Sequence, residues 1–418
     1  MRFELAPDPD QVVLMARHAG LSRVVENFCL EIVCKKPAQR RAEETYGLSG
    51  DQLTEVPWTA PALERAWRET HPTRFPWFSE DRLSSRVPKE ACRARAAGFA
   101  NWLASRNGNR QGARVRFPKW RKRKHGNRFR YDADRAKPVD PHAVWLPGIG
   151  PVATRENMSW LTDRLAADTA RILGSSVRER AGRWWISFQL EVDRDEINAR
   201  RRVPEGAPKA GIDLGLNRFA VIVDEDGSIE ELRAPKPLTQ AQRALKRANR
   251  RLARCQPQSN NWRKARTRVA ALHLRIAHRR IDFLHKTTTR LARTKSVLAV
   301  ETLNVKGMSA NRRLARGLAD AGFYEFMRQL EYKAGWYGSR VWKADRWFPS
   351  TRTCGDCGLI NSELTLADRE WVCPRCAVTH DRDHNAARNL LVAFLTENEN
   401  IDLAGKFPGE VKRLAETA

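Results

Sequence analysis

The sequence lacks any apolar run of about twenty residues, the length that a membrane-spanning helix requires. Its first residues, MRFELAPDPDQ, also lack the charged and then apolar pattern of a secretory signal. These absences argue against a membrane or secreted protein, so we expect a cytoplasmic one. Acidic residues are scarce as well, because 49 Asp and Glu face 76 Lys and Arg, a net charge of +27. Since such self-repulsion destabilises a compact state, the charge indicates a polyanionic partner, with nucleic acid favoured over an anionic membrane.

A disulfide framework is absent too. Four of the eight cysteines are scattered without framework spacing: Cys29, Cys34, Cys92 and Cys255. In a reducing compartment we interpret them as buried small hydrophobic residues or inert surface thiols.

The other cysteines form two Cys-x-x-Cys pairs separated by fifteen residues: Cys354, Cys357, Cys373 and Cys376. This spacing is typical of a four-thiolate zinc site, and the alternative is a chance pattern of reduced thiols. The adjoining Gly355, Gly358 and Pro374 favour zinc, since they suit the tight turns of two knuckles. Four thiolates leave no position open for water, so we expect a structural zinc ion.

The excess of basic residues is concentrated in two segments. Residues 106–130 hold eleven Lys or Arg and no acid, with Phe117, Trp120 and Phe129 interleaved. A solvated basic loop is one interpretation, but aromatic side chains between arginines favour a nucleic-acid contact through phosphate neutralisation and base stacking. The residues that we expect to make it are Lys119, Trp120, Arg121, Lys122, Arg123 and Lys124.

Residues 236–295 hold eighteen Lys or Arg and one acid, Asp282. Two long helices are predicted here, at about 238–256 and 261–295, broken at Gln256–Pro257 and packed as a hairpin. The imbalance exceeds what a solvated, salt-bridged helix surface needs, so we expect a face that binds a nucleic-acid duplex. The candidate contacts are Arg247, Arg250, Arg251 and Arg254.

The remaining pattern predicts mixed structure. Residues 1–115 are mainly helical after a short opening strand, and a helix is expected to end at Asn107–Gly108. Residues 140–200 are β-structure with a hairpin turn at Ala181–Gly182, for which we expect a small barrel or sheet. A strand, turn, strand pattern with a second hairpin turn at Asp226–Gly227 follows residue 209. Further helix is expected across 319–338, and we see no internal repeats.

Three carboxylates carry the catalytic hypothesis. Asp213 ends an apolar strand before Gly215, which alone is ordinary turn chemistry. Glu301 interrupts an apolar strand, where burying an ionised carboxylate costs roughly several kcal/mol without a cation or donor. Asp383 begins an amphipathic helix and by itself reads as a cap. Their order matches an RNase H-like nuclease, in which two hard cations about 4 Å apart bridge the scissile phosphate.

Five segments in this order, GIDLGLNRFAV, AVETLNVKGM, WFPSTRTCGDCG, CPRC and HDRDHNAARNL, resemble the RuvC and zinc-ribbon motifs of the TnpB family of bacterial insertion sequences. The resemblance covers residues 208–395 and extends more weakly to the N-terminal half. It implies that the catalytic, Mg²⁺-binding acids are Asp213, Glu301 and Asp383, with Asp381 a nearby decoy. His384 differs from the small apolar residue common at its position.

The resemblance also implies an organisation and a function. We expect a multidomain α+β protein with a wedge-like β-barrel (1–12 and 117–205), a helical recognition domain (13–116), a RuvC nuclease domain (206–350 and 377–395), an inserted zinc ribbon (351–376) and a C-terminal tail (396–418). The implied function is RNA-guided cleavage of both strands of a double-stranded DNA target that carries an adjacent motif, with a guide RNA and Mg²⁺ as cofactors, in the bacterial cytoplasm and on the nucleoid when DNA-bound.

Three alternatives stay open. A compact type V CRISPR effector has the same chemistry but a guide from a CRISPR array. An RNA-guided DNA-binding repressor without cleavage is disfavoured by the three intact acids. A transposase acting on its own element is less favoured, because the sequence has no candidate tyrosine-recombination motif.

Overall fold

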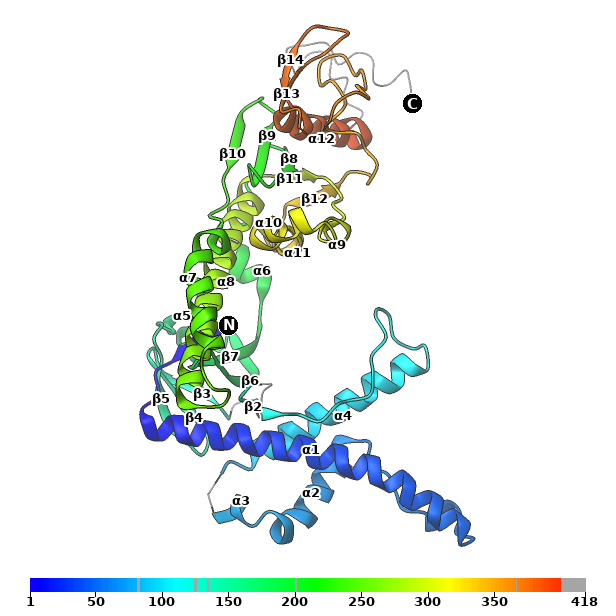
Figure 1. The fold of residues 1–418 in the computed structure, drawn as a ribbon, viewed down its shortest axis with the longest axis vertical. Coiled ribbons are helices and arrows are strands. Elements are labelled where there is room, and N and C mark those ends of the chain that lie inside the picture. Colours follow the sequence, from blue (N-terminus) through cyan, green and yellow to red (C-terminus); the bar gives the residue numbers. More distant parts are fainter. Residues whose placement is uncertain (81–82, 124–125, 134, 200, 366, 400–418) are drawn as a thin grey trace. The chain divides into compact units, whose positions relative to one another are not determined.

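The computed structural model describes residues 1–80, 83–123, 126–133, 135–199, 201–365 and 367–399 (Figure 1). The chain divides into two compact units, which we call unit 1 (Met1–Asp193) and unit 2 (Arg194–Ala418). Both mix helices and strands, which confirms the α+β, multidomain class.

Unit 1 combines three long helices with two small sheets. Its elements are β1 (Arg2–Leu5), α1 (Pro9–Thr45), the 3₁₀ turn η1 (Gly50–Gln52), α2 (Ala60–Arg74), α3 (Trp77–Glu80), α4 (Arg86–Arg106), β2 (Arg128–Asp132), β3 (Lys137–Asp140), β4 (Ala143–Leu146), β5 (Gly150–Ala153), α5 (Ser159–Ala166), β6 (Ala170–Arg180) and β7 (Arg183–Val192). The predicted helical N-terminal region and the helix end at Asn107 are confirmed. The β6–β7 turn also lies where expected, with Ala181 and Gly182 both at positive φ.

The predicted barrel is wrong for the described part of unit 1. The strands form an antiparallel sheet of order β1-β7-β6-β2 and a separate meander of order β3-β4-β5. One isolated bridge, Leu5 to Thr154, joins them. The edge strands β1 and β2 do not pair with each other; instead α1 and α4 pack beside β2, and their apolar side chains share one core with the sheet. The pattern of strands in the sequence alone did not reveal that helices pack beside the edge of the sheet, where the closure of a barrel would have required another strand.

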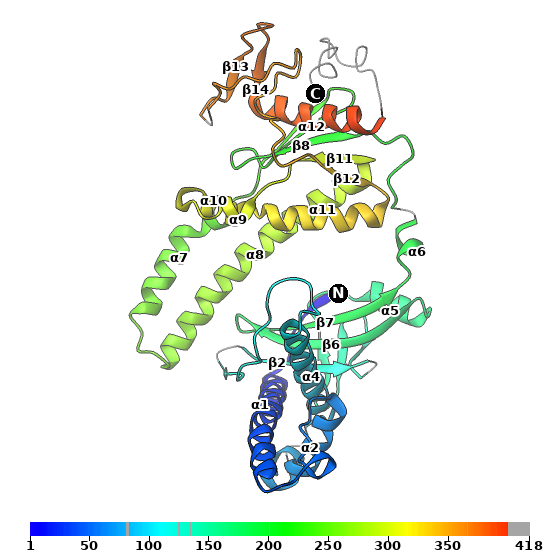
Figure 2. The same ribbon diagram turned by 90° about the vertical axis from the view of Figure 1, so that its right-hand side faces the viewer.

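Unit 2 is built on one five-stranded sheet. Its elements are α6 (Arg194–Ala199), β8 (Ala210–Leu214), β9 (Ala220–Asp224), β10 (Ile229–Leu232), α7 (Pro237–Ala253), α8 (Asn260–Thr294), β11 (Val297–Val300), α9 (Val305–Met308), α10 (Arg312–Ala321), α11 (Phe323–Tyr337), β12 (Arg340–Lys343), β13 (Glu370–Val372), β14 (Thr379–Asp381) and α12 (Arg382–Glu399). The predicted helical hairpin is present as α7 and α8 and projects away from the sheet (Figure 2). The helix expected across 319–338 is instead two helices, because Gly322 adopts a positive φ between them.

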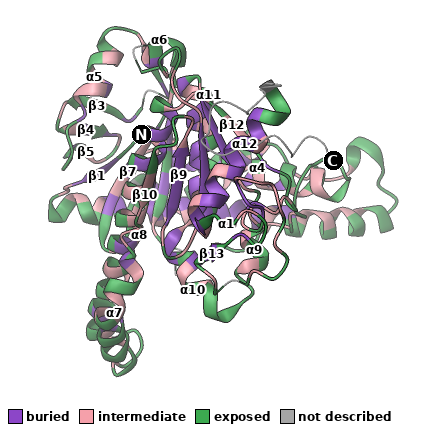
Figure 3. Cartoon of the chain, turned by 90° about the horizontal axis from the view of Figure 1, so that it is seen from above, coloured by how far each residue is buried: buried purple, intermediate pink, exposed green. Residues whose placement is uncertain are grey.

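The sheet order is β10-β9-β8-β11-β12, with β8 antiparallel to β9 and parallel to β11. Helix α12 covers one face, and α10 and α11 cover the other (Figure 1). Because side chains alternate along a strand, Ile212 and Leu214 enter the core with α8, α10 and α11, while Gly211 and Asp213 belong to the α12 face. A Cβ at Gly211 would lie 1.9 Å from the carbonyl oxygen of Ala387, so only glycine permits this close approach of α12. Strands β8, β9 and β11 are buried, whereas the edge strand β10 is partly exposed, and the strands beside the β9 label are purple in Figure 3.

The predicted tail begins inside α12, since that helix runs to Glu399, and residues 400–418 lie outside the described residues.

Candidate active site and metal centre

Asp213 occupies the central strand of unit 2, one residue before the end of β8. Asp213 is only 7% exposed. Burial raises the pKa of the Asp213 carboxyl well above its ordinary value, and the nearby charges of Glu301 and Asp383 raise it further. A buried carboxylate beside two others is unfavourable without a cation, so the site fits a positively charged ligand.

Glu301 follows directly after β11, the parallel neighbour of β8. Val300 lies opposite Ile212 in the register, so Glu301 and Asp213 lie side by side at the same edge of the sheet. Burial raises the pKa of the Glu301 carboxyl to about 7, while the N–H of Leu214 lowers it; the same N–H lowers the pKa of Asp213. Two acids from segments 88 residues apart in the chain therefore meet at one edge of the sheet.

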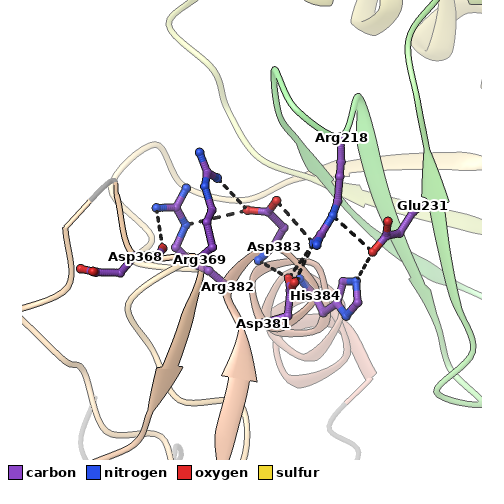
Figure 4. A network of polar contacts seen from close by, with 8 residues as sticks. All are labelled: Arg218, Glu231, Asp368, Arg369, Asp381, Arg382, Asp383 and His384. Carbon is purple, nitrogen blue, oxygen red and sulfur yellow. Dashed lines mark hydrogen bonds and ion pairs between the residues drawn. The ribbon is translucent and has the colours of Figure 1, made fainter.

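Asp383 reaches the same place from the first turn of α12 and is 8% exposed. Unlike the other two acids, it is surrounded by guanidinium groups: Arg369 at 3.6 Å, Arg218 at 3.7 Å and Arg382 at 3.8 Å (Figure 4). Its charge is therefore balanced within the protein.

Asp381 is the residue whose role the sequence did not reveal. Its Oδ1 accepts hydrogen bonds from the backbone N–H of Asp383 (3.0 Å) and of His384 (3.1 Å), which caps α12. Both of its oxygens also accept from Arg218 Nη1 at 2.8 Å (Figure 4). Arg218 lies in the turn between β8 and β9 and contacts Glu231 on β10 as well. Asp381 therefore orients the helix that carries Asp383 instead of facing the other acids.

The three acids together offer hard oxygen ligands of the kind that Mg²⁺ prefers. Among the described residues, however, two sets of three or more potential ligands have all their ligand atoms within 4.8 Å of one another: the four paired cysteines and Cys354–Asp356–His380. The acids form no such set, so this structure does not present one ion with all three carboxylates at once.

The four paired cysteines form the candidate metal centre. Cys354 and Cys376 have their sulfur atoms 3.6 Å apart, and so do Cys357 and Cys373. A tetrahedral zinc site with bonds of about 2.3 Å has sulfur–sulfur edges of about 3.8 Å. The arrangement therefore fits one zinc ion. Burial raises the pKa of the Cys373 thiol, but the N–H groups of Cys376 and Arg375 outweigh it and lower that pKa to about 7.

His380 is a neighbour of this centre that the sequence did not reveal. Its Nε2 lies 3.0 Å from Cys354 Sγ, and its ring lies 4.8 Å from that of Trp371. Burial lowers the pKa of His380. A neutral imidazole with Nε2 protonated donates to a thiolate, so His380 is placed to support Cys354 as a metal ligand. Because the two Cys-x-x-Cys pairs already supply four ligands, their spacing gives no signal for a histidine beside them.

The predicted nucleic-acid residues divide into two groups. Eight of the side chains are exposed and stay candidates: Lys119, Trp120, Lys122 and Arg123 in unit 1, and Arg247, Arg250 and Arg251 on α7 with Arg254 at its C-cap in unit 2. Arg121 does not fit the prediction, because its guanidinium is buried and donates to Glu26 at 2.6 Å and Ser22 at 3.0 Å. Lys124 lies outside the described residues.

Comparison with known proteins identifies the family. Residues 187–312 match a sequence family described as a probable transposase (OrfB_IS605), and residues 323–390 match the Cas12f1-like TNB domain. A candidate RNA-guided DNA endonuclease of Streptomyces pristinaespiralis is 33% identical over 94% of this chain and 89% of its own length. The candidate RNA-guided DNA endonuclease InsQ of Escherichia coli K12 is 28% identical over 94% and 91%. TnpB-like protein L79 of Acanthamoeba polyphaga mimivirus is 26% identical over 48% and 42%.

In the described part of the chain, no helix is long and apolar enough to span a membrane. With a relative at 33% identity that aligns along nearly its full length, the chain belongs to the TnpB family of candidate RNA-guided DNA endonucleases.

Proposed function

We propose that this protein is an RNA-guided endonuclease that cuts double-stranded DNA at a single RuvC-type site. One observation carries the proposal: Asp213, buried in the central strand of the unit 2 sheet, lies near enough to Glu301 and Asp383, from distant segments of the chain, for their charges to raise its pKa. The strand order β10-β9-β8-β11-β12, in which three antiparallel strands are followed by two parallel ones, supports an RNase H-like domain. The names of the relatives support the substrate.

The proposed chemistry assigns a task to each acid. Asp213 and Glu301 would hold Mg²⁺ from adjacent strand ends, and Asp383 would complete the site from α12. When bound, Mg²⁺ supplies an activated water and stabilises the leaving oxygen of the scissile phosphate. Because the pKa values of Asp213 and Glu301 are raised, cation binding at these carboxyls would be coupled to proton release. Products with 5′-phosphate and 3′-hydroxyl ends are expected.

The other groups are assigned in the same way. The four paired cysteines would bind a structural zinc ion and make residues 351–376 a ribbon beside the acids. The exposed arginines of α7 and the basic segment of unit 1 would bind the guide RNA and the DNA target through their phosphates. Guide pairing would supply sequence specificity, and a short motif beside the target would be read by the protein itself.

Substitution of Asp213 tests the proposal. Asp213→Ala and Asp213→Asn should abolish cleavage of a plasmid by the protein with its co-purified RNA, while RNA and target binding remain. Asp226→Asn is the matched control, since Asp226 lies in the exposed β9–β10 turn, where Asn before Gly is equally suited. Cleavage by Asp213→Asn near the wild-type rate would remove Asp213 from the metal site. Target binding without cleavage by the wild-type protein would instead favour the repressor. Sequencing of the co-purified RNA separates a transposon guide from a CRISPR one.

A further inference from the structure

Two asparagines on α12 lie directly beyond Asp383 and are almost completely buried. Asn385 is 4% exposed and Asn389 is 3% exposed. A carboxamide group that is removed from water is unfavourable unless it forms hydrogen bonds, so the partners of these side chains show what they hold in place. The proposed chemistry at the acids uses neither residue.

Both asparagines bind the backbone of the first cysteine knuckle. Asn385 Oδ1 accepts from the N–H of Gly355 at 2.8 Å, and its Nδ2 donates to the carbonyl of Thr353 at 2.7 Å. Asn389 Nδ2 donates to the same carbonyl at 2.7 Å and to that of Ser350 at 2.8 Å. Since Thr353 and Gly355 flank Cys354, these four hydrogen bonds seat the knuckle on α12.

The contact is specific in shape and charge as well. A Cβ at Gly355 would lie 2.9 Å from Asn385 Oδ1, so the knuckle needs glycine to approach the helix. One turn along, Arg388 Nη1 donates to Asp356 at 3.0 Å. Positions 385, 388 and 389 lie three and four residues apart and so share one face of the helix.

The seated segment reaches the third acid. Arg369, which lies between the two cysteine pairs, places its guanidinium 3.6 Å from Asp383 Oδ1 (Figure 4). Helix α12 is itself fixed by packing against the sheet through Leu390, Leu391 and Phe394. Because α12 is already held by the sheet, the asparagines hold the knuckle in place relative to the acids.

We propose that Asn385 and Asn389 are positioning residues that dock the cysteine-bearing segment on α12 and thereby hold Arg369 at Asp383. The effect on cleavage rests on the proposed nuclease function, whereas the docking itself does not. Without the asparagines the segment keeps its cysteines, the Arg388–Asp356 contact and the hydrogen bond from the Arg382 N–H to the Arg369 carbonyl (2.8 Å), but it loses the four hydrogen bonds that seat its first knuckle on α12.

Hydrogen–deuterium exchange and cleavage rates, measured on the full-length protein with its co-purified RNA, test this proposal. In Asn385→Ala and Asn389→Ala, we expect backbone exchange across residues 350–358 to accelerate at least tenfold and kcat for DNA cleavage to fall at least tenfold. Zinc content and the KM for target DNA should not change. Asn385→Asp keeps the acceptor for Gly355 but places a carboxylate oxygen against the Thr353 carbonyl in a buried site, so its effects should be at least as large. Asn398→Ala, near the other end of α12, is the matched control.

A double-mutant cycle separates positioning from general damage. If the asparagines act through Arg369, Arg369→Gln lowers kcat and Asn385→Ala lowers it little further in the double variant. Multiplicative losses in kcat would overturn the proposed route through Arg369, and unchanged exchange at 350–358 would overturn the docking. Loss of zinc from both alanine variants would also overturn the proposal, because the asparagines would then be needed for the metal site itself. If Asp213→Asn still cleaves DNA, the nuclease assignment fails, but the exchange result still decides the docking.

Discussion

Replacement of Glu301 by glutamine is expected to stabilise the metal-free protein while it removes a proposed metal ligand. Burial raises the pKa of the Glu301 carboxyl from 4.5 to about 7. The folded state therefore binds this proton more tightly than the unfolded state. The stabilisation of the folded state by the protonated Glu301 carboxyl is fully present below pH 4.5 and is lost as the pH rises through about 7. Glutamine keeps the shape of the side chain and has no charge to bury.

The size of the effect follows from that shift. One pKa unit corresponds to about 1.4 kcal/mol, so the free energy of unfolding of the glutamine variant should exceed that of the wild type by up to ~3 kcal/mol at pH 8. Near pH 4.5 the two proteins should have nearly the same free energy of unfolding. Removal of the charge also relieves its repulsion with Asp213, which acts in the same direction at high pH.

Urea unfolding of the full-length protein at pH 5, 7 and 8 measures this difference. Mg²⁺ is removed by dialysis without a chelator, so that bound zinc is retained. Glu325→Gln is the control of opposite sign, because a hydrogen bond from Arg328 lowers the pKa of Glu325 to about 2 and its neutralisation should destabilise the protein near neutral pH. Added Mg²⁺ should stabilise the wild type and not Glu301→Gln. A glutamine variant no more stable than the wild type at pH 8 would refute a buried, cation-seeking Glu301.

Two further predictions concern the metal centre and the basic hairpin. Elemental analysis should give about one zinc per chain. Cys373→Ser should lose most of this zinc, since three thiolates and a hydroxyl form a poorer site. A folded, active and zinc-free wild-type preparation would contradict the prediction. The second prediction concerns four exposed arginines at the end of α7: Arg247, Arg250, Arg251 and Arg254. Their conversion to glutamine should weaken RNA binding and lower the slope of log K against log salt by about 0.7 to 0.9 for each phosphate that the protein no longer neutralises. An unchanged slope in a filter-binding titration would show that the nucleic acid binds elsewhere.

Local sequence patterns predicted what depends on local chemistry. The turns at Ala181–Gly182 and Asp226–Gly227, the break between α7 and α8 and the apolar strands before Asp213 and Glu301 all lie where the residues indicate. Each depends on a turn residue or a run of one kind of side chain. The two cysteine pairs come together for a similar reason, because fixed spacing and nearby glycines specify the knuckles.

Features that depend on distant partners were not predictable in this way. Arg121 stands among exposed basic residues, yet its partner Glu26 lies 95 residues away in α1 and draws its guanidinium inside. The prediction of a barrel was wrong because the pattern of strands in the sequence does not show that helices α1 and α4 pack beside the edge strand β2. The sequence showed no role for Asp381. The reason is that Asp381 caps α12 and accepts hydrogen bonds from Arg218, which lies 163 residues away in the chain, and both contacts exist only in the folded protein.

The three acids differ in what balances their charge, and this difference bears on the order of events at the site. Asp383 has three guanidinium groups within 3.8 Å. In the described residues, neither Asp213 nor Glu301 forms an ion pair, and both have raised pKa values. A cation that approached Asp213 and Glu301 would meet carboxyls whose pKa values are raised, whereas one that approached Asp383 would have to compete with three arginines. Since arginine does not give up its charge, the pair on the sheet is the less hindered place for a first ion. Under the proposed function, Asp383 would become available to a cation if its arginines turned toward another anion, and the phosphate of the substrate strand is the anion that the site is proposed to receive.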